Sequence, residues 1–203
     1  MILKVCIQME EIYSLKPASI FEVADENVFF EREDEEHSDY INSGNHYELF
    51  YAISKYYDPD SILEIGTRNG YSLYSLALGS TTLTNVVGYD VQEECIEATK
   101  TSLESLLPED VGLKIENINS QELDSLDDSY YLIHIDGDTS FEGRYHDLEL
   151  TRGKARVVLV SDFFSERSGR DAAQRFVYDN RNLIKKTHVI ESLRGLYIIE
   201  YLG

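Results

Sequence analysis

The sequence predicts an α/β fold of the Rossmann-like, doubly wound kind, built on a mostly parallel seven-stranded sheet. Three observations carry this prediction. Short apolar runs alternate with segments of helical period from about residue 47 onwards. A glycine-spaced turn, Gly66 to Gly70, joins one apolar run to a helical segment. Two final apolar runs flank Arg194-Gly195, which is typical of a hairpin. Alternating strands and helices imply a parallel sheet with helices on both faces.

The individual elements follow in order along the chain. The sequence predicts helices over 47–57, 71–78, 92–107, 141–150 and 168–182, and strands over 61–65, 86–89, 111–117, 130–136, 156–162, 187–192 and 196–201. Asp58-Pro59, Gly79-Ser80 and Pro108 end helices. Ser168 is expected to cap the last helix. The closing hairpin predicts an antiparallel strand at the edge of the sheet.

Length and composition narrow the class of protein. The 203 residues suffice for one domain, which we expect to comprise an N-terminal cap or lid segment, 1–46, and a core, 47–203. The formal net charge of −20 argues against a nucleic-acid partner, because affinity for phosphates comes from Lys and Arg. No apolar run approaches membrane-spanning length. Cys6 and Cys95 do not suggest a disulfide framework, which favours a cytoplasmic setting.

Polar side chains follow the apolar runs at the point where each predicted strand ends. Ligands of such sheets bind outside the carboxyl ends of the strands. The residues at these ends are Glu64, Gly66, Asp90, Asn119, Ser120, Asp136, Asp138, Ser161 and Asp162. Asp90 lies 20 residues after Gly70, a spacing that suits a carboxylate binding ribose hydroxyls. Any one acid could serve as a turn-former or helix cap, but the recurrence predicts a site for a nucleotide-like ligand.

Two motifs resemble those of class I S-adenosylmethionine-dependent methyltransferases. Leu63-Glu-Ile-Gly-Thr-Arg-Asn-Gly-Tyr-Ser72 is similar to the first motif of the branch that contains small O-methyltransferases acting on catechols, caffeoyl-CoA and macrolide sugars. His134-Ile-Asp-Gly-Asp-Thr-Ser-Phe-Glu-Gly143, followed by Asp147-Leu-Glu149, resembles the Ile-Asp-Gly-Asp-His-Ser-Tyr-Glu-Gly segment of bacterial members. The resemblance covers about residues 45–201.

The resemblance implies methyl transfer from S-adenosylmethionine to a small-molecule acceptor, with a hydroxyl as the expected target. The residues that it implies for cofactor binding are Glu64, Gly66, Thr67, Arg68, Gly70, Asp90, Val91, Ser120, Gln121 and Asp136. Glu64 would shape the loop or hold the cofactor's ammonium group, and Asp90 would bind the ribose. Val91 would pack on the adenine, and Asp136 would face the transferred methyl group.

The resemblance also raises the question of a magnesium ion. In metal-using members, the Asp that matches Asp136 joins an Asp-Asp or Asp-Asn pair, which here reads Ser161-Asp162. Mg²⁺ on Asp136 and Asp162 is one expectation. In its absence Asp136, Asp138 or His46 would act as a general base toward a hydroxyl or amine. His134 is expected to lie inside its strand, away from the site.

Other functions stay open at this point. An aminopropyltransferase would use a similar sheet. A methyltransferase-like binding protein without catalysis is suggested by Ser161 and by Thr139, which replaces the histidine of the related segment. A nicotinamide-dependent oxidoreductase is disfavoured, because Gly66-x-x-x-Gly70 lacks the G-x-G-x-x-G spacing. The sequence does not identify the acceptor, and a homodimer is the default expectation for the assembly.

Overall fold

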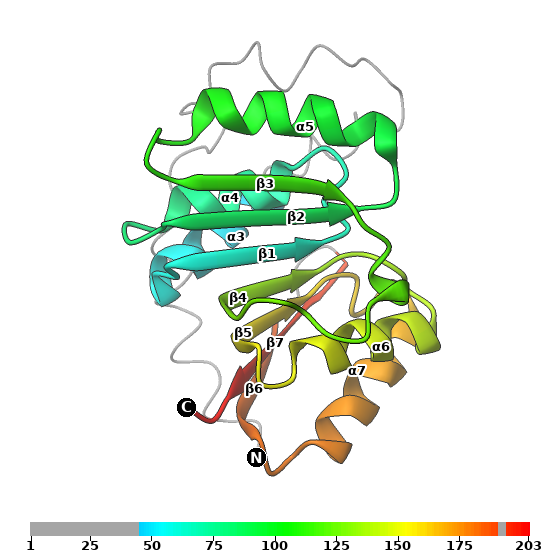
Figure 1. Cartoon of the computed structure of the whole chain (residues 1–203). Helices are drawn as coiled ribbons and strands as arrows, with labels where there is room; N and C mark the ends of the chain where they lie inside the picture. The colour runs from blue at the N-terminus through cyan, green and yellow to red at the C-terminus, as the bar shows by residue number, and fades with distance from the viewer. Residues whose placement is uncertain (1–44, 191–193) are drawn as a thin grey trace.

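The structure, a computed structural model, describes residues 45–190 and 194–203. Helices and strands alternate as the sequence predicts, with ends shifted by a few residues (Figure 1). The helices are α3 (Asn45–Tyr57), α4 (Tyr71–Gly79), α5 (Glu93–Leu106), α6 (Phe141–Thr151) and α7 (Arg167–Asp179), with a short 3₁₀ turn, η1 (Ser120–Glu122). The strands are β1 (Ser61–Ile65), β2 (Asn85–Asp90), β3 (Gly112–Asn117), β4 (Tyr130–Ile135), β5 (Ala155–Val160), β6 (Ile184–Ile190) and β7 (Leu196–Tyr201).

One seven-stranded sheet in the order β3-β2-β1-β4-β5-β7-β6 forms the centre of the molecule. The pairs β1–β2, β1–β4, β2–β3 and β4–β5 are parallel, which confirms the predicted fold class. Strand β7 runs antiparallel to both β5 and β6. The two strands of the closing hairpin pair antiparallel, as predicted; β6 forms the edge, and β7 lies between β5 and β6. The reason is burial: every residue of β7 is buried, whereas β6 keeps exposed positions.

Helices cover both faces of the sheet and divide the core into two apolar layers. The first layer packs α3, α4 and α5 against one face, with Phe50, Leu73 and Leu103 among its fully buried side chains. The second packs α6 and α7 against the other face, through residues such as Leu148 and Phe176. In Figure 1 the arrowheads of β1, β2 and β3 point to the same side, so their carboxyl ends meet at one edge of the sheet.

A buried acid ties α3 to the two last strands. The Tyr57 hydroxyl donates to Glu200 Oε1 at 2.7 Å, and Lys186 Nζ lies 3.0 Å from the same atom. His188 Nε2 lies 3.4 Å away. Burial by itself raises the pKa of Glu200, but its hydrogen bonds with His188, Tyr57 and Lys186 prevail and bring it down to about 2. Glu200 is therefore an ionised, fully partnered carboxylate of the core.

Helix α7 begins differently from the prediction. Its N-cap position is Glu166, which makes no side-chain cap hydrogen bond, and Ser168 lies inside the first turn. The Ser168 hydroxyl donates instead to the carbonyl oxygen of Thr139, 3.1 Å away. A tertiary contact with the loop after β4 thus uses the hydroxyl that we expected to cap the helix.

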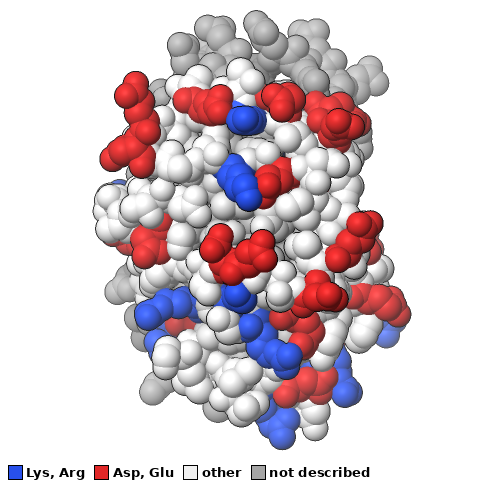
Figure 2. All heavy atoms as spheres, viewed as in Figure 1, with Lys and Arg blue, Asp and Glu red and all other residues white. Residues whose placement is uncertain are grey.

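The surface carries acidic side chains widely, in keeping with the net charge. Figure 2 shows them over most of the visible face, whereas Lys and Arg gather mainly in the lower half of this view. Among the helices of the described ranges, none is long and apolar enough to cross a membrane.

Candidate functional site

A pocket of about 580 Å³ opens at the carboxyl ends of the parallel strands, a size typical of sites for small molecules and cofactors. The sequence candidates that line it are Gly66, Thr67, Arg68, Gly70, Asp90, Val91, Asn119, Ser120, Gln121, Asp136, Asp138, Ser161 and Asp162. Further lining residues include Tyr47, Ser72 and Arg194. Glu64 lies behind the wall, with no exposed surface. The side chain of His46 falls outside the described residues.

The turn after β1 is shaped by three residues in the left-handed region. Gly66, Arg68 and Gly70 have φ values of 89°, 45° and 75°. The N–H groups of Gly66 and Thr67 both donate to the carbonyl oxygen of Tyr89, which ties the turn to β2. A Cβ on Gly66 would lie 2.6 Å from the carbonyl group of Asp136, so only glycine lets the ends of β1 and β4 approach this closely.

Asp90 joins this turn to the next one. Its Oδ2 accepts a hydrogen bond from the Arg68 N–H at 2.6 Å, and its Oδ1 accepts one from the Gln92 N–H at 2.8 Å. The carboxylate is thereby fixed at the pocket wall, and its remaining lone pairs can accept from a ligand hydroxyl. Val91, the next residue, is 64% exposed and lines the same pocket.

A buried acid that the sequence reasoning did not single out holds the wall after β3. Asp147 Oδ1 accepts hydrogen bonds from the Ser120 hydroxyl at 2.7 Å and from Gln121 Nε2 at 2.8 Å. Asp147 has no exposed surface, and this burial raises its pKa to about 6. Its place in the Asp147-Leu-Glu149 segment was the available signal, because that segment follows the second motif.

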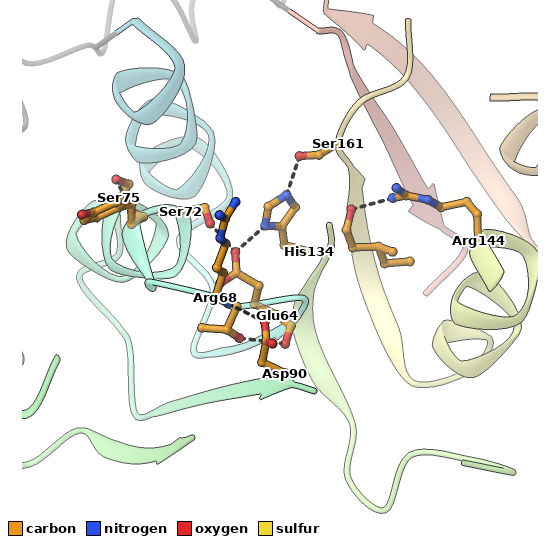
Figure 3. Close-up of polar contacts among 11 residues, drawn as sticks. Glu64, Arg68, Ser72, Ser75, Asp90, His134, Arg144 and Ser161 are labelled. Carbon is orange, nitrogen blue, oxygen red and sulfur yellow. Dashed lines mark hydrogen bonds and ion pairs between the residues drawn. The ribbon is translucent and has the colours of Figure 1, made fainter. Parts of the chain in front are cut away.

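A hydrogen-bonded chain runs behind the pocket from the first turn of α4 to the end of β5 (Figure 3). The Ser72 hydroxyl donates to Glu64 Oε1 at 2.5 Å, and His134 Nδ1 lies 2.7 Å from the same oxygen. On the other side of the ring, His134 Nε2 lies 2.7 Å from Ser161 Oγ. Glu64 and His134 are fully buried, and Ser161 is 4% exposed. The first and last members, Ser72 and Ser161, both line the pocket.

Burial dominates the protonation of this chain. Loss of water raises the pKa of Glu64 to about 8 and lowers that of His134 to about 4. Glu64 Oε2 is buried and has no hydrogen-bond partner among the described residues, as suits a protonated acid better than a carboxylate. Near neutral pH the pair therefore holds one proton and no net charge. His134 lies inside the strand as expected, yet it reaches the site through Ser161.

Two acids follow β4 and reach the pocket. The Asp136 carboxyl is exposed to the open pocket but enclosed by protein on its other sides, and this desolvation raises its pKa to about 6. The neighbouring carboxylate of Asp162 adds to this rise. Asp138 Oδ1 accepts a hydrogen bond from the Ser140 N–H at 2.8 Å and so shapes the loop before α6.

The donors around Asp136 do not fit a magnesium ion. Asp162 Oδ2 lies 3.6 Å from the Arg194 guanidinium. Mg²⁺ requires oxygen ligands in a strict octahedral arrangement, and a cation beside Asp162 opposes its binding. Within residues 45–190 and 194–203, no three His, Cys, Asp or Glu side chains come together as a metal site.

Comparison with known proteins places the fold. No protein-family model matches the sequence, and a search of curated proteins finds no match. Among solved structures, the O-methyltransferase TomG of Streptomyces achromogenes, in complex with SAM, is 15% identical over 96% of both chains, with a TM-score of 0.65. An SAH-bound O-methyltransferase of Bacillus cereus is 16% identical over 97% of both chains, with a TM-score of 0.64. The SAH-bound methyltransferase PaMTH1 of Podospora anserina is 15% identical over 97% of this chain and 94% of its own, with a TM-score of 0.65. The chain thus has the Rossmann-like fold of these methyltransferases.

Proposed function

We propose that the protein transfers a methyl group from S-adenosylmethionine to a hydroxyl of a small molecule. One observation carries the proposal: the glycine turn, the fixed carboxylate of Asp90 and the acid Asp136 line a single pocket at the carboxyl ends of the strands. The solved structures of the same fold that hold SAM or its product SAH support the choice of cofactor.

The residues of the pocket fit this cofactor. When bound, S-adenosylmethionine supplies an activated methyl group on a positively charged sulfur. The backbone of Gly66 to Gly70 would lie against its methionine part, since the absence of a side chain on both glycines allows close approach. Asp90 would accept hydrogen bonds from the ribose, and Val91 would cover one face of the adenine. Ser120 and Gln121, held by Asp147, would border the adenine's other side.

Asp136 would orient the acceptor's hydroxyl and take its proton as the new bond to carbon forms. A carboxylate with a pKa near 6 is largely ionised at neutral pH and is a stronger base than an ordinary aspartate. Asp138 lies farther along the same loop, and its engagement with Ser140 favours a role in shaping that loop. Because the donor set does not suit Mg²⁺, we propose that the transfer needs no metal.

We further propose that residues 1–46 form a cap over a core of residues 47–203; most of the cap lies outside the described residues. We also propose His46 as a second candidate base, a cytoplasmic location and a homodimer. The high negative charge and the small pocket favour a small acceptor over a nucleic acid.

Calorimetric titration with S-adenosylhomocysteine tests the proposal at the level of the cofactor. We expect saturable binding that Asp90→Ala weakens at least about tenfold, in line with the loss of charge-assisted hydrogen bonds. NAD⁺ serves as the comparison ligand. A protein that bound NAD⁺ and ignored S-adenosylhomocysteine would be an oxidoreductase-like nucleotide binder, contrary to the proposal.

Catalysis is tested with radiolabelled S-adenosylmethionine and a panel of catechols, phenols and sugars. Asp136→Asn should lower the rate on any methylated compound by about 100-fold or more, the usual contribution of a general base. Its binding of S-adenosylhomocysteine should change little. Cofactor binding without turnover of any compound would favour the non-catalytic alternative.

A further inference from the structure

The proposed reaction gives no role to the hydroxyl of Ser161. Ser161 lines the pocket directly after β5, beside Asp136 at the end of β4. The two positions are linked through the backbone, because the Ser161 N–H donates to the carbonyl oxygen of Ile135. Its hydroxyl is held from behind by His134 at 2.7 Å (Figure 3).

The support behind this hydroxyl is rigid. The His134 ring is fully buried, with the Phe50 ring packed 4.7 Å away between centroids. Glu64 holds the opposite ring nitrogen, and Ser72 holds Glu64. A side chain fixed by this many buried contacts keeps one orientation, as a group that must position a substrate requires.

The hydroxyl keeps a capacity to accept a hydrogen bond from the pocket. A serine oxygen has one proton and two lone pairs. If it donates to His134 Nε2, both lone pairs stay open. If His134 Nε2 carries the proton and donates to the serine, one lone pair stays open. In either tautomer Ser161 can therefore bind a donor that enters the pocket next to Asp136.

Several charged groups lie around the Ser72–Glu64–His134–Ser161 chain, but they do not replace its hydrogen bonds. Asp136 and Asp162 lie toward the pocket, Arg144 lies buried on the side of α6, and Asp90 lies on the side of β2. The Arg144 guanidinium donates to the carbonyl oxygen of Ile135 and is oriented by it. Within the described residues, the close contact between His134 and Glu64 is the only such charge pairing that involves either of these two side chains.

We propose that Ser161 binds the reacting hydroxyl of the acceptor at the site of methyl transfer, with His134 and Glu64 as positioning residues behind it. This inference rests on the proposed function. The acceptor oxygen would lie between the Asp136 carboxylate and Ser161 Oγ. Its single proton would go to Asp136, and where His134 Nε2 donates to Ser161, the Ser161 O–H would donate to one of its lone pairs. Such a site selects acceptors that carry a hydrogen-bond donor on the reacting atom.

The experiment uses the cofactor analogue sinefungin, so it needs no knowledge of the acceptor. Sinefungin carries an amine on the carbon that replaces the methyl-bearing sulfur, and S-adenosylhomocysteine has no group there. If Ser161 faces the transfer site, it accepts a hydrogen bond from this amine. The measured quantity is the ratio of the two dissociation constants, determined by calorimetry on the full chain.

We expect Ser161→Ala to weaken sinefungin binding by about 5- to 20-fold, the effect of one hydrogen bond to a charged donor. Binding of S-adenosylhomocysteine should stay within about twofold of the wild type, and Ser161→Thr should keep most of the sinefungin preference. His134→Phe keeps the ring packing but removes the support, and should give an intermediate loss. Ser105→Ala, an exposed serine on α5, is the matched control.

The outcomes distinguish the role of Ser161 from the proposed function of the protein. An unchanged ratio in a Ser161→Ala protein with wild-type unfolding would overturn the inference. A parallel loss of both ligands, together with a lower unfolding midpoint, would also overturn it, because it would show a structural role alone. Failure of the wild type to bind either ligand would instead overturn the proposed function, and the inference with it.

Discussion

Glu64→Gln is the most informative single change for the buried chain. Glutamine keeps the size of glutamate and the oxygen that accepts from Ser72, but it cannot ionise. In the wild type, burial raises the pKa of Glu64 from 4.5 to about 8. The unfolded chain gives up this proton near pH 4.5, whereas the folded chain holds it until about pH 8. Between these values the folded state binds more protons, so stability falls as pH rises.

The size of the effect follows from the two pKa values. At about 1.4 kcal/mol per pKa unit, the stability cost of the buried acid grows from about 2 kcal/mol at pH 6 to about 4 kcal/mol at pH 8. The wild type should therefore lose about 2 kcal/mol relative to Glu64→Gln across this range. It does not matter whether the proton resides on Glu64 or His134, because the measurement counts the protons of the pair.

Urea unfolding at several pH values between about 6 and 8 measures this difference. Other groups that titrate there are common to both proteins and cancel in the comparison. Glu94→Gln, an exposed change on α5, should leave the pH dependence as in the wild type. Parallel pH profiles for the wild type and Glu64→Gln would refute the reasoning, because they would show that the folded pair has already lost its proton below about pH 6.

Two further predictions concern the turn and the core. Gly66→Ala should abolish measurable binding of S-adenosylhomocysteine and lower stability by about 1–3 kcal/mol, because its Cβ would lie 2.6 Å from the carbonyl group of Asp136 and its φ is 89°; calorimetry and thermal unfolding check both. Glu200→Gln should reduce the loss of stability on acidification, since the pKa of Glu200 is lowered to about 2 and its contribution is present above its ordinary value of 4.5. Acid titration followed by circular dichroism should show a shallower loss between about pH 5 and 2, and an unchanged acid limb would contradict the assignment of Glu200.

Much of the pocket wall formed by β1, β2 and the turn between Gly66 and Gly70 was predictable because it is local in the chain. The turn from Gly66 to Gly70 needs left-handed backbone and close approach, and both requirements are visible as glycines at fixed spacing. Asp90 was predictable because β2 ends in an acid, and parallel strands bring their carboxyl ends to one edge. The second motif likewise placed Asp136 at the end of β4.

The connections among these residues were not predictable in the same way. Asp147 reaches Ser120 and Gln121 only because α6 packs beside the turn after β3. Likewise, the Ser168 hydroxyl donates to the carbonyl oxygen of Thr139 in the loop after β4 and does not cap α7. Side chains far apart in the sequence interact according to how the elements pack, and hydrophobic periodicity carries no information on such pairs.

The sequence by itself determined the alternation of helices and strands, the glycine turn and the acids at the strand ends, because each depends on neighbouring residues and on a period of two or 3.6. Only the tertiary structure decided that β7 inserts between β5 and β6, and that Glu64, His134 and Ser161 form one chain across three parallel strands. The physical reason is that strand order and buried hydrogen bonds depend on which apolar surfaces pack against each other. These surfaces come from elements far apart in the chain, so the packing depends on the whole sequence.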